Sequence, residues 1–134
     1  MTDPHRIAIA RDADIVVARQ AGRELAGEAG LKGSDLTLVA TAISEVARNI
    51  VVYAGRGEIS LSIVEEGARR GISVVARDDG PGIADLESAM RDGYSTGGSL
   101  GLGLPGARRL MDEVEIVSKV GTGTTVTMRK WMRR

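Results

Sequence analysis

The chain has 134 residues, 43% of them hydrophobic and 27% charged, and its formal net charge is zero. This size and composition are typical of a soluble globular protein, so we expect a single domain over residues 1–134 with one hydrophobic core. The neutral charge and the 2% aromatic content argue against a nucleic-acid partner, because such surfaces need basic fields and stacking rings. There is no Cys and one His, which excludes disulfides and argues against histidine catalysis.

The two ends of the chain carry no targeting signal in this interpretation. No N-terminal apolar segment is apparent, and no apolar run is expected to approach the ~18 residues of a membrane span. We therefore expect a cytoplasmic protein with no membrane partner. The C-terminal run MRKWMRR is locally basic, and it predicts a solvated end with Trp131 packed against the body; a docking patch for an acidic partner is the alternative.

The first half of the chain predicts one strand and two helices. Apolar residues recur at helical spacing in both long segments, Asp12 and Asp14 are typical of a helix start, and Gly30 of a helix end. The expected ranges are 6–10 for the strand, 12–30 for the first helix and, from a cap at Ser34 or Asp35, about 34–53 for the second.

The second half predicts two strand pairs with helices between them. The expected ranges are strands 58–67 and 71–80 around a turn at 68–71, a loop and short helix in 81–92, a helix at 105–113, and strands 114–120 and 124–130 around a turn at 121–123. Because strands come in hairpin pairs, we expect an α+β fold. It would be a two-layer sandwich in which helices cover one face of a mixed, mostly antiparallel sheet.

A glycine-rich stretch, GYSTGGSLGLGLPG, fills residues 93–106 and contains G-x-G-x-x-G. A dinucleotide site does not explain it, because no strand leads into the glycines and no acid follows about 20 residues later. No P-loop pattern occurs either. Two interpretations remain open: a loop whose amides hold an anion ahead of a helix, or a surface loop without a ligand.

The second helix carries a polar pair on an otherwise apolar stripe. Glu45 and Asn49 lie four residues apart, away from the expected solvent stripe, which consists of Thr37, Thr41, Ser44 and Arg48. A carboxylate turned away from bulk water needs a partner, and a Mg²⁺ ion with water or phosphate would serve. An ordinary surface pair is the alternative. The full stripe consists of Leu38, Ala42, Glu45, Asn49 and Val52.

A second polar motif follows the strand at 71–80. In D-x-G-x-G, Asp78 ends a buried strand, and Gly80 and Gly82 allow a tight turn. A carboxylate in that position can accept a hydrogen bond from an exocyclic amine, although a plain turn explains the same residues. By itself, the G-T sequence of the last hairpin indicates only a β-strand.

Taken in order, E-x-x-x-N, D-x-G-x-G, G-x-G and G-T resemble the motifs of GHKL-type (Bergerat-fold) ATP-binding domains, over nearly the whole chain. The resemblance implies ATP and Mg²⁺ as cofactors. It implies Glu45 as general base, Asn49 as Mg²⁺ ligand and nucleotide contact, Asp78 as partner of the adenine amino group, and Thr124 in the adenine network. The other implied nucleotide contacts are Gly80, Gly82, Ile83, Gly98, Ser99, Leu100, Gly101, Leu102 and Gly103.

The glycine-rich stretch would close over the phosphates as an ATP lid. It contains no Lys, so backbone amides and Arg91 or Arg108 would have to meet the phosphates. With no dimerisation helices and no transducer domain in the chain, we do not expect a histidine kinase, a topoisomerase or an Hsp90 function.

Residues 78–116 are most similar to RsbT-like switch kinases of the bacterial stressosome. That resemblance implies a serine/threonine kinase that phosphorylates STAS-domain proteins (RsbS- and RsbR-like) and then binds and activates an RsbU-like phosphatase. Two alternatives stay open. One is an RsbW- or SpoIIAB-like kinase that sequesters a sigma factor, and the other is a non-catalytic binding module gated by ATP.

Overall fold

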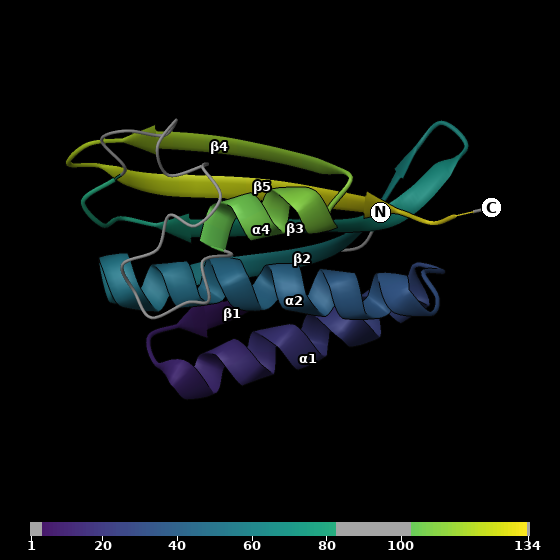
Figure 1. Cartoon of the computed structure of the whole chain (residues 1–134), viewed down its shortest axis with the longest axis horizontal. Coiled ribbons are helices and arrows are strands. Elements are labelled where there is room, and N and C mark those ends of the chain that lie inside the picture. Colours follow the sequence, from purple (N-terminus) through teal and green to yellow (C-terminus); the bar gives the residue numbers. More distant parts are fainter. Residues whose placement is uncertain (1–3, 83–102, 134) are drawn as a thin grey trace.

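The structure is a computed structural model that describes residues 4–82 and 103–133 (Figure 1). The elements are β1 (His5–Ile9), α1 (Asp12–Glu28), α2 (Ser34–Asn49), the π-helix η1 (Ile50–Ala54), β2 (Gly57–Glu66), β3 (Arg69–Asp78), α4 (Gly103–Leu110), β4 (Glu113–Lys119) and β5 (Gly123–Trp131). The short helix expected within 81–92 lies outside the described residues, apart from its first two positions.

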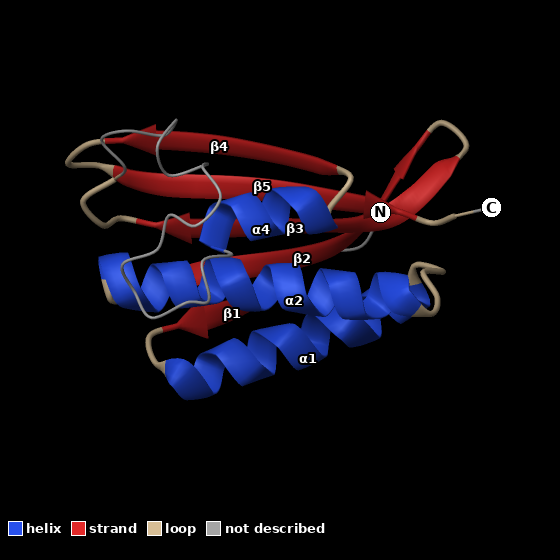
Figure 2. Ribbon diagram, in the orientation of Figure 1, coloured by secondary structure: helices blue, strands red, loops and turns tan. Residues whose placement is uncertain are grey.

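The described strands form one sheet in the order β1-β2-β3-β5-β4. Figure 2 shows α1, α2 and α4 packed on one face of it, so the predicted α+β two-layer arrangement is confirmed. All described pairings are antiparallel, and no parallel pair of the expected mixed sheet occurs among them. Two of the pairings, β2–β3 and β4–β5, are hairpins, which pair only in the antiparallel sense.

Strand alternation decides which side chains enter the core. On β2 and β3 the helix-facing positions are buried and aliphatic, and the positions between them face the open side of the sheet. The helix-facing residues are Ile59, Leu61, Ile63, Ile72, Val74 and Ala76. On the helical side, α1 and α2 approach closely at Gly22, where an added Cβ would lie 2.0 Å from Ile43 Cδ1.

Most element boundaries fall within two or three residues of the predicted ones. Asp14 Oδ2 accepts hydrogen bonds from the N–H groups of Ala10 and Arg11, which confirms its role at the start of α1. The β2–β3 turn was predicted at 68–71 but is a two-residue turn at 67–68, because Gly67 supplies the positive φ of 62°.

The end of the second helix differs from the prediction. Residues 50–54 are π-helical, and Gly55 N–H donates to Ile50 O at 2.9 Å. A π turn is wider than an α turn and therefore shifts the residues that follow Asn49 around the axis. As a result Val52 is 42% exposed rather than aligned with the inward stripe.

By length and composition alone, Ser34–Ala54 could cross a membrane, so the expectation that no apolar run approaches this length was wrong. Packing gives the reason for its apolar character. Val39, Ala42 and Ile43 are fully buried, and α2 lies between α1, α4 and the sheet. The segment is a core helix of this fold.

The C-terminal run is less solvated than its charge predicted. Trp131 is packed against the body as expected, with 6% of its surface exposed, but Lys130 is buried, with 2% exposed. Lys130 Nζ donates to Leu110 O at 2.9 Å and lies 3.6 Å from Asp112 Oδ1 and 3.9 Å from Asp35 Oδ1. The lysine thus ties β5 to the end of α4 and the start of α2.

We expect Lys130→Met to lower the free energy of unfolding by about 1.5–3 kcal/mol, since it removes a hydrogen bond from a charged donor and leaves two carboxylates without their buried cation. Urea denaturation measures the loss. Lys119→Met, at an exposed position, is the control and should change stability by less than about 0.5 kcal/mol. Equal stability of both variants would contradict a structural role for Lys130.

Candidate functional site

Strand register brings several predicted site residues to one end of the molecule. Asp78 is the last residue of β3, and it pairs with Thr124 on β5 and with Gly57 on β2. The last turn of α2, which carries Asn49, runs into η1 at the same end (Figure 1). Motifs that are separate in the sequence therefore meet around Asp78.

The carboxylate of Asp78 is oriented by the turn that follows it. Its Oδ1 accepts the backbone N–H of Gly80 at 2.9 Å. This is the turn geometry expected of D-x-G, and it fixes one carboxylate oxygen. The second oxygen can accept a further hydrogen bond, such as one from an amine.

Three glycines pack directly around Asp78. An added Cβ would lie 2.1 Å from Asp78 O at Gly123, 2.4 Å from Arg77 O at Gly57, and 2.6 Å from Ala54 Cβ at Gly80. Gly123 also has a φ of 135°, which other residues rarely adopt. A side chain at Gly57 or Gly123 would displace the backbone that carries the acid, and one at Gly80 would collide with Ala54.

Gly82 shapes the other side of the same turn. Its φ is 76°, and an added Cβ would lie 2.4 Å from Lys119 O. Close by, Gly121 N–H donates to Pro81 O at 2.9 Å. The turn after β3 is therefore held against the β4–β5 hairpin, which places it beside the start of β5.

Thr124 is buried, with 5% exposed, and its Oγ1 lies 2.8 Å from Ser118 Oγ. The Ser118 hydroxyl is also within 3.3 Å of Gly123 O, to which it can donate. Sequence reasoning missed Ser118. The signal was the hairpin register, which places Ser118 directly opposite Thr124.

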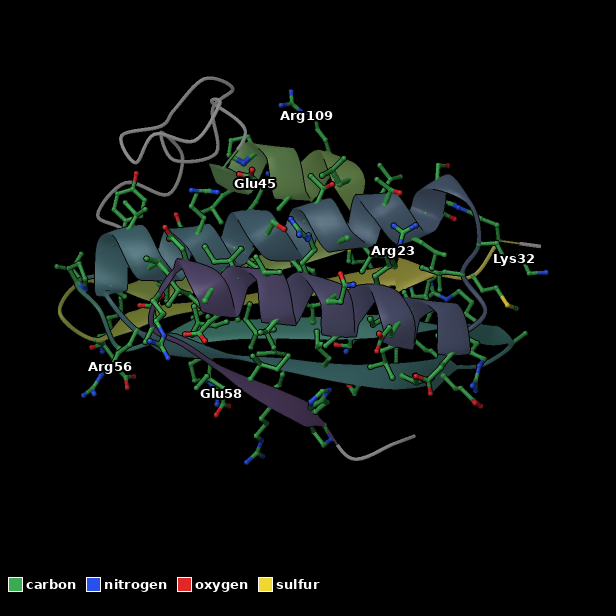
Figure 3. The ribbon with its side chains drawn as sticks, turned by 90° about the horizontal axis from the view of Figure 1, so that it is seen from below. Arg23, Lys32, Glu45, Arg56, Glu58 and Arg109 are labelled. Carbon is green, nitrogen blue, oxygen red and sulfur yellow. The ribbon has the colours of Figure 1, made fainter. Side chains whose placement is uncertain are left out.

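Glu45 and Asn49 are both half-buried on α2, while Thr37 and Arg48 on the predicted solvent stripe are exposed. Figure 3 shows Glu45 between α2 and α4, near the start of α4. Thr41 and Ser44 of the predicted solvent stripe are half-buried as well, so the orientation of the pair away from bulk water stays a prediction. The two oxygen-bearing side chains lie one helical turn apart on the same face.

Among the described residues, a cavity of about 580 Å³ lies against Asp78. It is lined by Ala54, Arg56, Gly57, Glu58, Arg77, Asp78 and Asp79. Apart from Asp78, none of these was predicted as a site residue. Ala54 reaches the cavity because η1 carries the chain toward Gly80, and no local pattern in the sequence predicts a π-helix.

Part of the predicted site falls outside the described residues. These positions are Ile83, Arg91, Gly98, Ser99, Leu100, Gly101 and Leu102. Gly103 is the first residue of α4, and Arg108 is exposed on the same helix. The predicted phosphate contacts of the glycine-rich stretch thus remain predictions.

Within residues 4–82 and 103–133, no group of three or more His, Cys, Asp or Glu side chains could hold a metal ion. Asn49 and Glu45 offer hard oxygen donors but not a complete set. Mg²⁺ usually keeps several waters and takes further ligands from phosphate oxygens of a substrate, and its binding here stays a prediction.

Residues 9–130 match the model of the histidine kinase-like ATPase domain. The chain belongs to this family. Membership confirms the resemblance to this ATPase family, and it implies that the chain uses ATP.

Individual relatives agree with that assignment. The chain is 47% identical to the serine/threonine-protein kinase RsbT of Bacillus subtilis over 133 residues, which cover 99% of this chain and all of that protein. It is 34% identical to the anti-sigma F factor of Geobacillus stearothermophilus over 104 residues, covering 72% of this chain and 69% of that protein.

A solved structure supports the fold. The crystal structure of the RsbU and RsbW domains of a Mycobacterium tuberculosis protein superimposes with a TM-score of 0.69 and 22% identity over 99% of this chain. The match spans 34% of that longer protein. At this identity the likeness concerns the fold alone.

We expect Gly123→Ala to weaken ATP binding by about tenfold or more, because the new Cβ collides with the backbone oxygen of Asp78 and displaces the acid. Calorimetric titration with ATP measures the affinity. Gly121→Ala is the matched control, because Gly121 also has a positive φ of 81° but an added Cβ there meets nothing within 4 Å. An equal loss in both variants would show that hairpin strain, and not the position of Asp78, causes the effect.

Proposed function

We propose that this chain is an ATP-dependent serine/threonine protein kinase of a partner-switching stress pathway. It phosphorylates a Ser or Thr of STAS-domain proteins (RsbS- and RsbR-like). The main support for this function is the 47% identity to the kinase RsbT over nearly the whole chain. The chain also has the half-buried Glu45 and Asn49 on one helix and an Asp78 carboxylate oriented by Gly80. The predicted kinase class agrees with that identity.

Asp78 and Thr124 form the base-recognition end of the proposed site. The carboxylate oxygen left after the Gly80 contact would accept a hydrogen bond from the 6-amino group of adenine. Thr124 pairs with Asp78 across the strands, so its hydroxyl would lie beside the same base. A base that presents an acceptor at this position would leave the carboxylate without a donor, and that disfavours guanine.

Glu45 and Asn49 form the phosphate end. Asn49 would hold Mg²⁺ together with phosphate oxygens, and the ion would supply charge neutralisation at the β- and γ-phosphates. The amides of residues 98–103 and Arg108 are the donors that we assign to the remaining phosphate charge. In phosphoryl transfer, positioning and charge stabilisation account for most of the rate.

Glu45 is the proposed general base. Its carboxylate would orient the hydroxyl of the partner's Ser or Thr and accept the proton as the oxygen attacks the γ-phosphorus. The bond from that phosphorus to the β–γ bridging oxygen then breaks, and ADP leaves. Such a base contributes typically 10²–10⁴-fold to the rate.

The partners and location follow from the same assignment. After transfer, the kinase would bind and activate an RsbU-like phosphatase, and we assign it to the cytoplasm as a single domain spanning residues 1–134. The 34% identity to an anti-sigma F factor supports a second candidate, a kinase that also sequesters a sigma factor. Recovery of a sigma subunit in a pulldown would favour that candidate.

We expect Glu45→Ala to keep ATP affinity within about twofold and to reduce phosphate transfer by about 10²–10⁴-fold, since only the base is lost. Intact-mass spectrometry of a STAS-domain partner after incubation with Mg·ATP measures transfer, and calorimetry measures binding. Glu24→Ala, at an exposed position on α1, is the control. Full transfer by Glu45→Ala would refute its role, and no transfer by the unaltered chain would favour the sequestering or non-catalytic alternatives.

We expect Asp78→Asn to weaken ATP binding by about tenfold or more, because the acceptor for the adenine amino group loses its charge and half of its oxygen atoms. Calorimetry with ATP measures the change. Asp79→Asn alters the neighbouring exposed acid and should leave the affinity unchanged. If Asp78→Asn also binds ATP like the unaltered chain, the adenine contact is misassigned.

A further inference from the structure

A row of three polar side chains crosses the helix-facing side of the sheet at its Asp78 end. Asp78 on β3 pairs with Thr124 on β5, and Thr124 pairs in turn with Ser118 on β4. Side chains directly opposite each other on antiparallel strands share one face, with Cβ atoms about 4.5–5.5 Å apart. The Thr124 side chain therefore has the Asp78 carboxylate as its neighbour on one strand and the Ser118 hydroxyl on the other.

The Ser118 hydroxyl contacts two groups of different chemistry. Its Oγ lies 3.3 Å from Gly123 O and 2.8 Å from Thr124 Oγ1. A carbonyl oxygen only accepts, whereas a hydroxyl has one proton to donate and two lone pairs with which to accept. Both contacts are hydrogen bonds when the Ser118 proton points to Gly123 O and the Thr124 proton points to Ser118 Oγ. The three groups thus form a chain of hydrogen bonds that runs from Thr124 through Ser118 to Gly123.

This order of protons decides what Thr124 can offer to a ligand. Because its only proton is directed to Ser118, the Thr124 hydroxyl presents lone pairs, and therefore an acceptor, to the space beside Asp78. Thr124 is 5% exposed, so bulk water competes little for that proton. The other end of the chain is fixed too, because Gly123 packs against the backbone of Asp78, where an added Cβ would lie 2.1 Å from Asp78 O.

We propose that Ser118 is a positioning residue that makes Thr124 an acceptor, so that the site selects purines with an amino group at C6 over purines with an oxygen there. The inference deepens the proposed function and rests on it, because it requires the C6 edge of the purine to lie at Asp78. The 6-amino group has two N–H bonds, one for Asp78 and one for Thr124. A 6-oxygen would face the lone pairs of Thr124 and form no hydrogen bond with it.

The test compares ATP with ITP, whose base carries an oxygen in place of the 6-amino group. Competition against a fluorescent ATP analogue on the full chain measures both dissociation constants. For the unaltered chain, ITP should bind about thirtyfold more weakly than ATP or worse. In Ser118→Ala the Thr124 proton is released and can be donated to the 6-oxygen of ITP. The ratio of the two constants should therefore fall by about fivefold or more, whereas a purely structural defect would weaken both nucleotides by the same factor.

Two variants of equal shape separate the hydroxyl of Ser118 from the volume of its side chain. Ser118→Thr keeps a hydroxyl and should keep the ITP-to-ATP ratio within about twofold of that of the unaltered chain. Ser118→Val has the same shape without the hydroxyl and should behave like Ser118→Ala. In a Thr124→Val background, which has no Thr124 proton to direct, Ser118→Ala should leave the ratio unchanged.

The outcomes separate the role of Ser118 from the proposed function. If ATP binds but Ser118→Ala and Ser118→Val leave the ITP-to-ATP ratio unchanged, Ser118 does not orient Thr124 and the inference is wrong, while the proposed function stands. The inference is also overturned if Ser118→Thr loses selectivity as fully as Ser118→Val, or if the unaltered chain binds ATP and ITP equally. If ATP itself does not bind, the proposed function fails, and the inference fails with it.

Discussion

The close backbone packing around Asp78 is the constraint on which the rest of the site depends. A carboxylate can recognise the edge of a base by hydrogen bonding only if its position is fixed to a fraction of an ångström. Here three strands converge on it, and Gly57, Gly80 and Gly123 touch their neighbours at distances that exclude a Cβ. The antiparallel register therefore also brings Asp78, the turn that orients it and Thr124 side by side at the same end of the sheet.

The second helix joins the core to the chemistry. One side of α2 carries fully buried aliphatic residues, and the same helix carries Asn49 and, beside α4, Glu45. Its continuation as a π-helix brings Ala54 against Gly80, which would not follow from an unbroken α-helix. Since the same helix builds the core and presents both polar groups, their spacing is as rigid as the core itself.

The sequence predicted the features that local periodicity encodes. Alternation predicted the hairpin strands, and helical spacing predicted the buried apolar face of α2 that carries Val39, Ile43 and Val46. It did not predict features that depend on distant partners. Lys130 looked solvated because its neighbours are basic, yet its partners Asp35 and Asp112 come from other elements. Ser118 opposite Thr124 and the π-turn before Gly55 depend on tertiary packing in the same way.

The two ends of α4 are held in place by different kinds of contact, polar at the C-terminal end and aliphatic at the start. At its C-terminal end Lys130 binds the carbonyl of Leu110, and Asp112 accepts the N–H of Trp131, so the helix end is fastened to β5. At its other end, the buried Leu104 and Ala107 pack into the core beside the helix that carries Glu45. Directional polar contacts thus fix the C-terminal end of α4 to β5, and close aliphatic packing fixes its start against the core.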